Sequence, residues 1–500
     1  MKKLQMVVNG LEKKAKINKE IYGHFVEQAG NVVYKGLFVG KNSEIPNING
    51  VRKDIIDAFR EINIPLLHWP GGGVADSYHW KRGIGPEDQR PTSINRWTLQ
   101  VEENTFGTHE FFDLCELLEC EPYLVLNVGS STVEEVQSWI EYITFDGDTE
   151  MTRLRKENGR DKPWKLKYIC MGNEWWFFES ARAYAEDYHR YNMFARDYGD
   201  NKLVRILRGP QHYAFKETDE LADYTDPGSF DAMTLYQIIP SEPNGDRLCM
   251  FTGQAFEMFS DDGFHFDEQG YYTTLQNALK MDERMSRHLG ILKRKDGNQN
   301  VKLVIDEWGT WYKQSDPNEI WSMPITMRDA IIAGTVLNLY NNRANDLLLC
   351  TVAMSVNGLC HLFETKDEKF LKTPVFHIFK MYRQHQDATL VHSFIEKETF
   401  TVNGCELPCI SYSASVKDGN MLITLVNAML DREYELSVNV LNHEFSACEG
   451  TILQEEIHAL NTFDNPDKVT AKEFTDFEIA DGSLTVRLPK ASVVSLLLKP

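Results

Sequence analysis

Eight short apolar runs, each bounded by turn residues, follow one another between about residue 20 and residue 357. Most are continuous rather than alternating, which is typical of parallel strands covered on both faces. Amphipathic helical patterns lie between several of them, at 51–62, 108–118, 133–143 and 181–198. This repeated alternation predicts an α/β fold, a (β/α)8 TIM barrel over residues 19–385. The runs are Ile21–Val26, Ile64–Trp69, Pro122–Val128, Leu166–Met171, Leu203–Leu207, Ala232–Gln237, Val301–Ile305 and Asp346–Ser355.

The pattern changes after about residue 385. Short runs that alternate between apolar and polar positions follow, separated by turn signals such as Lys417-Asp418-Gly419-Asn420. This predicts a C-terminal β-sandwich over residues 386–500. Residues 1–18 alternate in the same way, so we expect them to add one or more strands to the sandwich. The predicted strands are Cys409–Val416, Met421–Asn427, Tyr434–Val440, Leu484–Leu488 and Ser492–Leu498.

Composition and charge narrow the choice of partners. The chain has 500 residues, 42% of them hydrophobic and 25% charged, with a net charge of −21. That negative charge argues against nucleic acid and anionic membranes as partners. The N-terminus lacks the apolar core of a signal peptide, and the nine cysteines are scattered, which indicates a cytoplasmic protein with reduced thiols. No pair of cysteines has zinc-site spacing, and we expect neither a metal nor a cofactor.

Two strand ends carry the candidate chemistry. Asn173-Glu174 follows one apolar run and Asp306-Glu307 follows another, each with tryptophan beside it. The C-terminal ends of barrel strands converge, so glutamates 133 positions apart are expected to form one site. A pair of carboxyl groups in an aromatic cleft is the chemistry of glycoside cleavage. The alternative for either glutamate alone is a solvated loop carboxylate.

The two glutamates are given different roles. The aromatic residues after Glu174 would desolvate its carboxyl group and favour the protonated form, so Glu174 is the candidate acid/base. Glu307 is then the nucleophile of a retaining mechanism. Asn173 is placed to hold the sugar hydroxyl beside the reacting carbon. Asp261-Asp262-Gly263 is typical of a turn, with a weak cation site as the alternative.

The chain resembles glycoside hydrolase family 51, the α-L-arabinofuranosidases, as a divergent member. The resemblance implies a retaining barrel enzyme with a C-terminal β-sandwich, a hexamer or trimer, and no cofactor. It also implies that Glu27 binds furanose hydroxyls and that Trp97 and Trp308 shape the pocket. The matching segments are Ile21–Glu27, Trp69-Pro70-Gly71-Gly72, Tyr78–Pro86, Asn104–Phe111, Leu126–Ser130, Gly172-Asn173-Glu174, Asp306–Tyr312 and His385–Thr389.

Several positions depart from the pattern of that family. His68 stands where the family usually has arginine, and Gly73 stands where it usually has Asn or Cys followed by Phe. After the sixth strand, Tyr236 and Ile238 replace the usual His and aromatic residue. Met354 stands where a glutamine that contacts the sugar is expected. These changes predict a less polar sugar site, so substituting Met354→Gln with Gly73→Asn should move preference towards L-arabinofuranose. Residues 175–178 would supply an apolar platform for an aglycone.

Three hypotheses follow from the sequence. The first is an intracellular, exo-acting α-L-arabinofuranosidase that acts on oligosaccharides or small glycosides. The second is a glycosidase of the same fold with shifted specificity, for another furanoside or a related sugar. The third is a sugar-binding protein that has lost catalysis, which the retention of both Glu174 and Glu307 disfavours.

Overall fold

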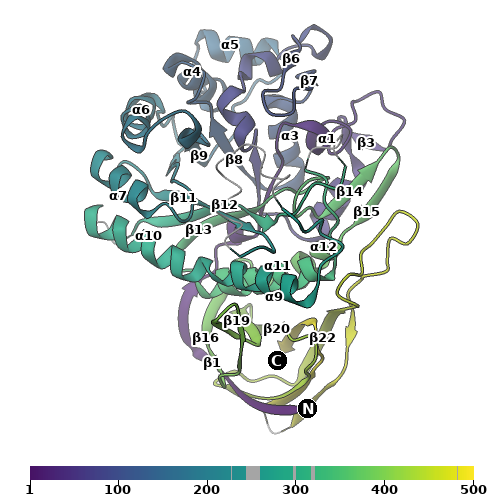
Figure 1. The fold of residues 1–500 in the computed structure, drawn as a ribbon. Coiled ribbons are helices and arrows are strands. Elements are labelled where there is room, and N and C mark those ends of the chain that lie inside the picture. The colour runs from purple at the N-terminus through teal and green to yellow at the C-terminus, as the bar shows by residue number, and fades with distance from the viewer. Residues whose placement is uncertain (227, 244–258, 297–299, 317–320, 481) are drawn as a thin grey trace.

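The computed structural model describes residues 1–226, 228–243, 259–296, 300–316, 321–480 and 482–500. A closed barrel of eight parallel strands forms the larger part (Figure 1). Each of the eight predicted runs overlaps one barrel strand, and the strands follow chain order around the barrel, so this prediction is confirmed. The strands are β2 (Gly23–Phe25), β5 (Leu66–Trp69), β8 (Glu121–Leu126), β9 (Tyr168–Met171), β10 (Val204–Leu207), β11 (Ala232–Ile239), β12 (Lys302–Thr310) and β13 (Leu347–Val352).

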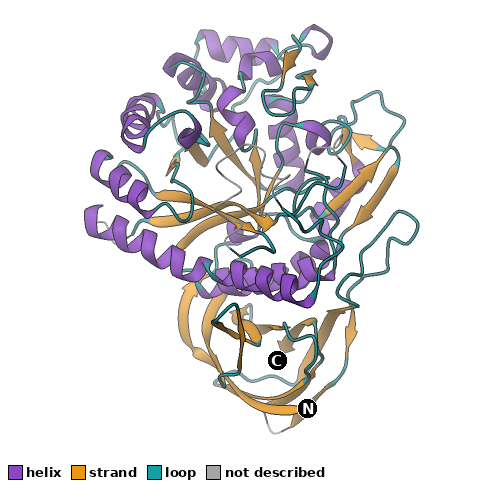
Figure 2. Ribbon diagram, in the orientation of Figure 1, coloured by secondary structure: helices purple, strands orange, loops and turns teal. Residues whose placement is uncertain are grey.

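Helices surround the barrel (Figure 2). Three of the four predicted helices occur close to their expected bounds, whereas the helix expected over 181–198 ends at Phe194. The carboxylate of Asp197 accepts hydrogen bonds from Leu203 N and Arg205, which holds the chain outside the helix. The helices are α1 (Gly30–Val33), α2 (Lys53–Glu61), α3 (Thr108–Leu118), α4 (Val133–Thr144), α5 (Glu150–Glu157), α6 (Ala181–Phe194), α7 (Phe215–Tyr224), α9 (Glu268–Leu279), α10 (Met281–Asp296), α11 (Met327–Asn342) and α12 (Pro374–Tyr382).

A ten-stranded sheet forms the second part of the molecule, and both chain termini lie in it (Figure 1). Its first strand, β1 (Lys2–Lys16), pairs antiparallel with β16 and parallel with β21. All five strands predicted after residue 400 are present. The order in the sheet is β23 (Lys472–Phe474), β22 (Ala447–Gln454), β26 (Ser492–Lys499), β20 (Asn420–Asn427), β19 (Ile410–Lys417), β16 (Thr389–Ile395), β1, β21 (Tyr434–Leu441), β25 (Ser483–Leu488) and β24 (Phe477–Ala480).

A buried polar network joins the sheet to the barrel through α11. Asn338 Oδ1 accepts hydrogen bonds from the hydroxyls of Ser413 (2.9 Å) and Thr424 (2.7 Å). Asn341 donates to Ser413 Oγ at 3.0 Å and accepts from Tyr22 OH at 2.9 Å. Because α11 also packs against β12, this network fixes the barrel wall behind one of the candidate glutamates. Within the described ranges, no helix combines the length and apolar character needed to cross a membrane.

Candidate active site

The two candidate glutamates lie at the C-terminal mouth of the barrel. Glu174 follows β9, and Glu307 lies in the last half of β12. Two-residue alternation would normally turn Asp306 and Glu307 to opposite faces of the strand. A register shift between β11 and β12 leaves Asp306 without a partner, since Leu235 pairs with Ile305 and the next residue pairs with Glu307. Such a bulge re-aims side chains, and both carboxylates here approach Arg208.

Asp76 holds the backbone around Glu174. Its carboxylate accepts hydrogen bonds from the amides of Asn173, at 3.2 and 3.3 Å, and Glu174, at 3.0 Å. Asp76 lies in the 3-10 turn Gly73–Ser77 that follows β5, and is only 4% exposed. Asp76 was not predicted from the sequence, where its only signal is an acidic residue directly after the glycine-rich turn of a barrel strand.

The carboxyl groups of the site have raised pKa values. Burial is the main cause for Glu174, whose pKa rises to about 7, with the charge of Asp76 adding to the effect. Burial and the neighbouring Glu174 raise the pKa of Glu307 well above its usual range. The guanidinium of Arg208 lowers both pKa values, and it lies 3.7 Å from Glu307 Oε1. Both carboxyl groups therefore hold their protons more tightly than a free glutamate, and Arg208, which contacts Glu307 directly, opposes this in each.

Glu27 faces Glu307 across Gly72. A Cβ built on Gly72 would lie 2.8 Å from Glu307 Oε1 and 3.4 Å from Glu27 Oε1, so the two carboxyl groups converge on this glycine. Val74 N donates to Glu27 Oε1 at 3.2 Å, and burial raises the pKa of Glu27 to about 8. The structure thus brings Glu27 to the mouth, as its place after β2 predicts.

Arg208, directly after β10, lies between these groups and was missed by the sequence analysis. Its side chain is fully buried. The guanidinium donates to Asn173 O at 2.5 Å and also to Asn173 Oδ1, Tyr236 OH and Asp306 Oδ2. Asn173 Nδ2 has no partner among the described residues, so one donor of this amide stays available beside the glutamates.

Aromatic side chains form one wall of the mouth. Trp176 meets Tyr236 edge to face, with ring centroids 5.4 Å apart. Trp176 and Trp311 pack against a buried cluster of Tyr236, Ile238 and Phe259. Trp311 belongs to the matching segment after Glu307, but no role was predicted for it. Residues 244–258, which precede Phe259, lie outside the described residues.

Trp97 reaches the mouth from a hairpin formed by β6 (Ser93–Ile94) and β7 (Val101–Glu102). A Cβ on Gly73 would lie 2.6 Å from Trp97 Nε1, so the indole occupies the space next to this glycine. The ring of Trp97 also lies 5.6 Å from that of Phe177, which is 38% exposed. Gly73 therefore admits a tryptophan, and Gly73→Asn would displace Trp97.

Comparisons with known proteins agree with this arrangement. Residues 58–231 match the α-L-arabinofuranosidase 1 domain, and residues 306–492 match the α-L-arabinofuranosidase C-terminal domain. An intracellular exo-α-L-arabinofuranosidase from Bacteroides ovatus is 37% identical over 100% of this chain and 96% of its own length. This chain belongs to glycoside hydrolase family 51, the α-L-arabinofuranosidases.

Solved structures of the family share the whole fold. The crystal structure of the GH51 arabinofuranosidase from Xanthomonas axonopodis pv. citri has a TM-score of 0.93 at 30% identity, covering 99% of this chain and 100% of that one. The arabinose complex of the α-L-arabinofuranosidase from Thermotoga maritima has a TM-score of 0.84 at 25% identity, with the same coverage. The barrel with a C-terminal β-sandwich is therefore the family's architecture, and this chain is a glycoside hydrolase.

Two tryptophans of this arabinofuranosidase do not lie where the sequence analysis placed them. Trp308 stacks near Phe379 of α12 and meets Tyr340 of α11 edge to face, so its ring faces the helices rather than the mouth. Strand alternation explains this, because Glu307 points inward and the next residue points outward. Trp175 is also buried, and it stacks on the ring of Tyr184 at 5.3 Å. The predicted platform over 175–178 therefore does not include Trp175.

His68 and Met354, two of the expected departures from the family pattern, are buried. His68 is fully buried between the rings of Phe25 (4.3 Å) and Tyr123 (4.6 Å). Burial and the charge of Arg208 lower the pKa of His68 well below its usual range, so its ring is neutral. Met354 is 1% exposed in the loop after β13, where its amide donates to Gly358 O at 3.1 Å. A contact between Met354 and the sugar stays a prediction.

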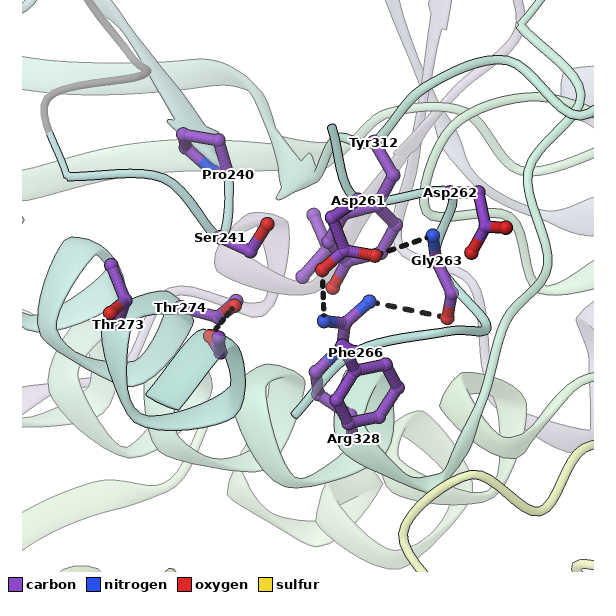
Figure 3. A network of polar contacts seen from close by, with 12 residues as sticks. Pro240, Ser241, Asp261, Asp262, Gly263, Phe266, Thr273, Thr274, Tyr312 and Arg328 are labelled. Carbon is purple, nitrogen blue, oxygen red and sulfur yellow. Dashed lines mark hydrogen bonds and ion pairs between the residues drawn. The ribbon is translucent and has the colours of Figure 1, made fainter. Parts of the chain in front are cut away.

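The Asp261 turn has a structural role (Figure 3). Asp261 accepts from Gly263 N at 2.6 Å and forms a 2.6 Å ion pair with the buried Arg328. The guanidinium lies between the rings of Phe266 (3.6 Å) and Tyr312 (4.0 Å). The turn prediction is thus confirmed. The carboxylate of Asp261 pairs with Arg328, which also contacts Tyr312 in the segment after β12. The described residues contain no cluster of three or more His, Cys, Asp or Glu side chains suited to a metal ion.

Proposed function

We propose that this chain is a retaining, exo-acting α-L-arabinofuranosidase in which Glu174 is the acid/base and Glu307 the nucleophile. The observation that carries this assignment is the different environment of the two carboxyl groups. The carboxylate of Asp76 accepts a hydrogen bond from the amide of Glu174, and its negative charge favours the protonated form of the Glu174 side chain. Glu307 Oε1 lies 3.7 Å from the guanidinium of Arg208; this cation lowers the pKa of both carboxyl groups, and its direct contact is with Glu307.

The reaction follows from these protonation states. Glu174 donates its proton to the glycosidic oxygen as Glu307 attacks the anomeric carbon, so the aglycone leaves as an alcohol and a glycosyl ester forms. Glu174, now ionised, takes a proton from water, whose oxygen attacks the same carbon and frees Glu307. Two inversions return the original configuration. The free Nδ2 of Asn173 would donate to the sugar hydroxyl beside the reacting carbon.

Leaving-group dependence tests the two roles. Glu174→Ala should retain turnover of nitrophenyl α-L-arabinofuranoside, which needs little protonation, and azide should restore part of the lost rate. Glu307→Ala should lose turnover for every leaving group. Glu186→Ala, which removes an exposed glutamate of α6, is the matched control. An equal loss in both site variants on the activated substrate, or an inverted product by NMR, would show that the roles are wrong.

A second candidate is the same chemistry with a preference for aromatic aglycones. It is supported by the exposed ring of Phe177, which together with Trp97 and Trp176 lines one side of the mouth. Flat apolar rings stack on such surfaces. A panel of arabinofuranosides with alkyl and aryl aglycones separates the candidates, because only the second predicts a KM that falls with aglycone ring area.

A cytoplasmic location and a homo-oligomeric state complete the proposal. The eight cysteines of the described residues are all unpaired, as in a reducing compartment, and the Bacteroides ovatus relative is described as intracellular. Ile94 (72% exposed), Leu99 (79%) and Val101 (67%) form an apolar tip on the β6–β7 hairpin, which suits a subunit contact. Light scattering of wild type and Leu99→Asp tests this, and a wild-type monomer would refute it.

A further inference from the structure

Arg208 is the one described cation in contact with both acidic residues of β12. It is fully buried, and a buried guanidinium requires partners for its donors. Asp306 takes one end of the fork. The other end faces Asn173 Oδ1, Tyr236 OH and, at 3.7 Å, Glu307 Oε1. A single planar group thus touches the nucleophile, its neighbour in the strand and the amide beside the acid/base.

The cation reaches the nucleophile from β10 rather than from β5. On β5, before the Trp-Pro-Gly-Gly turn, stands His68, whose buried ring is neutral. Arg208 enters the barrel from β10 instead. The side chains of β5, β10 and β12 meet inside the barrel: Thr351 bridges His68 Nδ1 (3.4 Å) to the backbone of Asp306, whose carboxylate binds Arg208.

We propose that Arg208 is a positioning residue that favours the ionised form of Glu307 and orients Asn173, supplying from β10 a positive charge that the neutral His68 on β5 does not. The inference rests on the proposed role of Glu307. Four other charged or titratable groups face Glu307. They are Glu27 after β2, Glu174 after β9, Tyr236 of β11 and Asp306, which precedes Glu307 on β12. Three of these groups are carboxylic acids and none is a cation. Arg208 is therefore the source of positive charge beside Glu307 among the described residues.

The pH profile of kcat/KM distinguishes positioning from simple structural support. Arg208→Met removes the charge but keeps the length of the side chain. The acidic limb, which reports protonation of Glu307, should then move up by about one to three pH units. Arg208→Lys keeps a charge without the planar fork, so its acidic limb should move by less than about half a unit while kcat falls at least about tenfold.

Arg205→Met is the matched control, because this arginine lies on the same strand and pairs with Asp197 at 3.0 Å near the surface. Its profile should match wild type. If Arg208→Met and Arg208→Lys both keep the wild-type limb and lose rate uniformly, Arg208 only supports the fold and the proposal is overturned. Thermal melting of each variant accompanies the kinetics.

Placing a positive charge at position 68 provides a second test. His68→Arg in the Arg208→Met background should restore the acidic limb to within about half a pH unit of wild type and recover at least about tenfold in kcat/KM. A folded double variant with the displaced limb of Arg208→Met would overturn the proposal. If Arg208→Met does not fold, the lysine variant decides, and wild-type kcat in it would refute the need for the fork. Absence of turnover by wild type would instead refute the proposed function.

Discussion

Gly72→Ala tests whether the mouth of the barrel is as tightly built around Glu307 as the structure indicates. The added Cβ would lie 2.8 Å from Glu307 Oε1 and within 3.5 Å of both oxygens of Glu27. Carbon and oxygen rarely approach closer than about 3.4 Å without repulsion, so the nucleophile must move by about half an ångström or more. A displacement of that order at a reacting atom costs roughly 100-fold in rate, or about 2.7 kcal/mol of transition-state stabilisation.

We expect Gly72→Ala to have little effect on stability, so a loss of rate can be attributed to the displaced nucleophile rather than to unfolding. The atoms that the added Cβ would approach are the ends of the Glu307 and Glu27 side chains, which can shift without moving the backbone. We therefore expect kcat/KM on nitrophenyl α-L-arabinofuranoside to fall about 100-fold with a melting temperature within a few degrees of wild type. Gly290→Ala on the exposed face of α10, where a Cβ meets nothing within 4 Å, is the control and should keep full activity. A Gly72→Ala enzyme within twofold of wild type would refute the reasoning.

Three further predictions concern the surroundings of the site. Phe177→Ala removes the exposed ring beside Trp97, so KM for aryl glycosides should rise about three- to tenfold while that for methyl arabinofuranoside should not change. Asp261→Asn leaves the buried guanidinium of Arg328 without its anion and should lower the free energy of unfolding by about 3 kcal/mol. Urea denaturation measures this, with Asp262→Asn at the neighbouring, partly exposed carboxylate for comparison. Burial raises the folded-state pKa of Glu174 to about 7, so ionising this group costs stability as pH rises from about 4.5 to about 7. The free energy of unfolding of Glu174→Gln relative to wild type should therefore be about 1–3 kcal/mol higher at pH 8 than at pH 4.5. An equal difference at both pH values would contradict this.

The barrel was predictable from the sequence because its physical cause is local. Strands covered on both faces are apolar at every position, and each of the eight runs stands out from the amphipathic helices around it. The convergence of strand ends then placed Glu174 and Glu307 at one mouth without any further information. Strand β22 was missed for the opposite reason, since most of its side chains are partly or fully exposed and carry no apolar alternation.

The errors at the site come from reading neighbours in sequence as neighbours in space. Trp175 and Trp308 each adjoin a glutamate, yet both rings point into packed core. Arg208 gave no signal and Asp76 only a weak one, because each acts through partners that lie about 100 positions away in the sequence. Asp76 meets the amide of Glu174, and Arg208 meets Asp306. Pairs this far apart cannot be recognised in a single sequence, because only the folded structure brings them together.

This difference between local and non-local information also bears on how His68 should be interpreted. Judged by the resemblance alone, a histidine where an arginine is expected removes a charge from the site and predicts weakened catalysis. Judged by the closed barrel, the same charge reaches Asp306 and Glu307 from β10 through Arg208. The interior of a barrel is shared by all its strands, so a requirement for one cation beside the nucleophile constrains the interior as a whole rather than one position. Loss of a motif residue therefore argues against activity only when no other strand supplies the same charge.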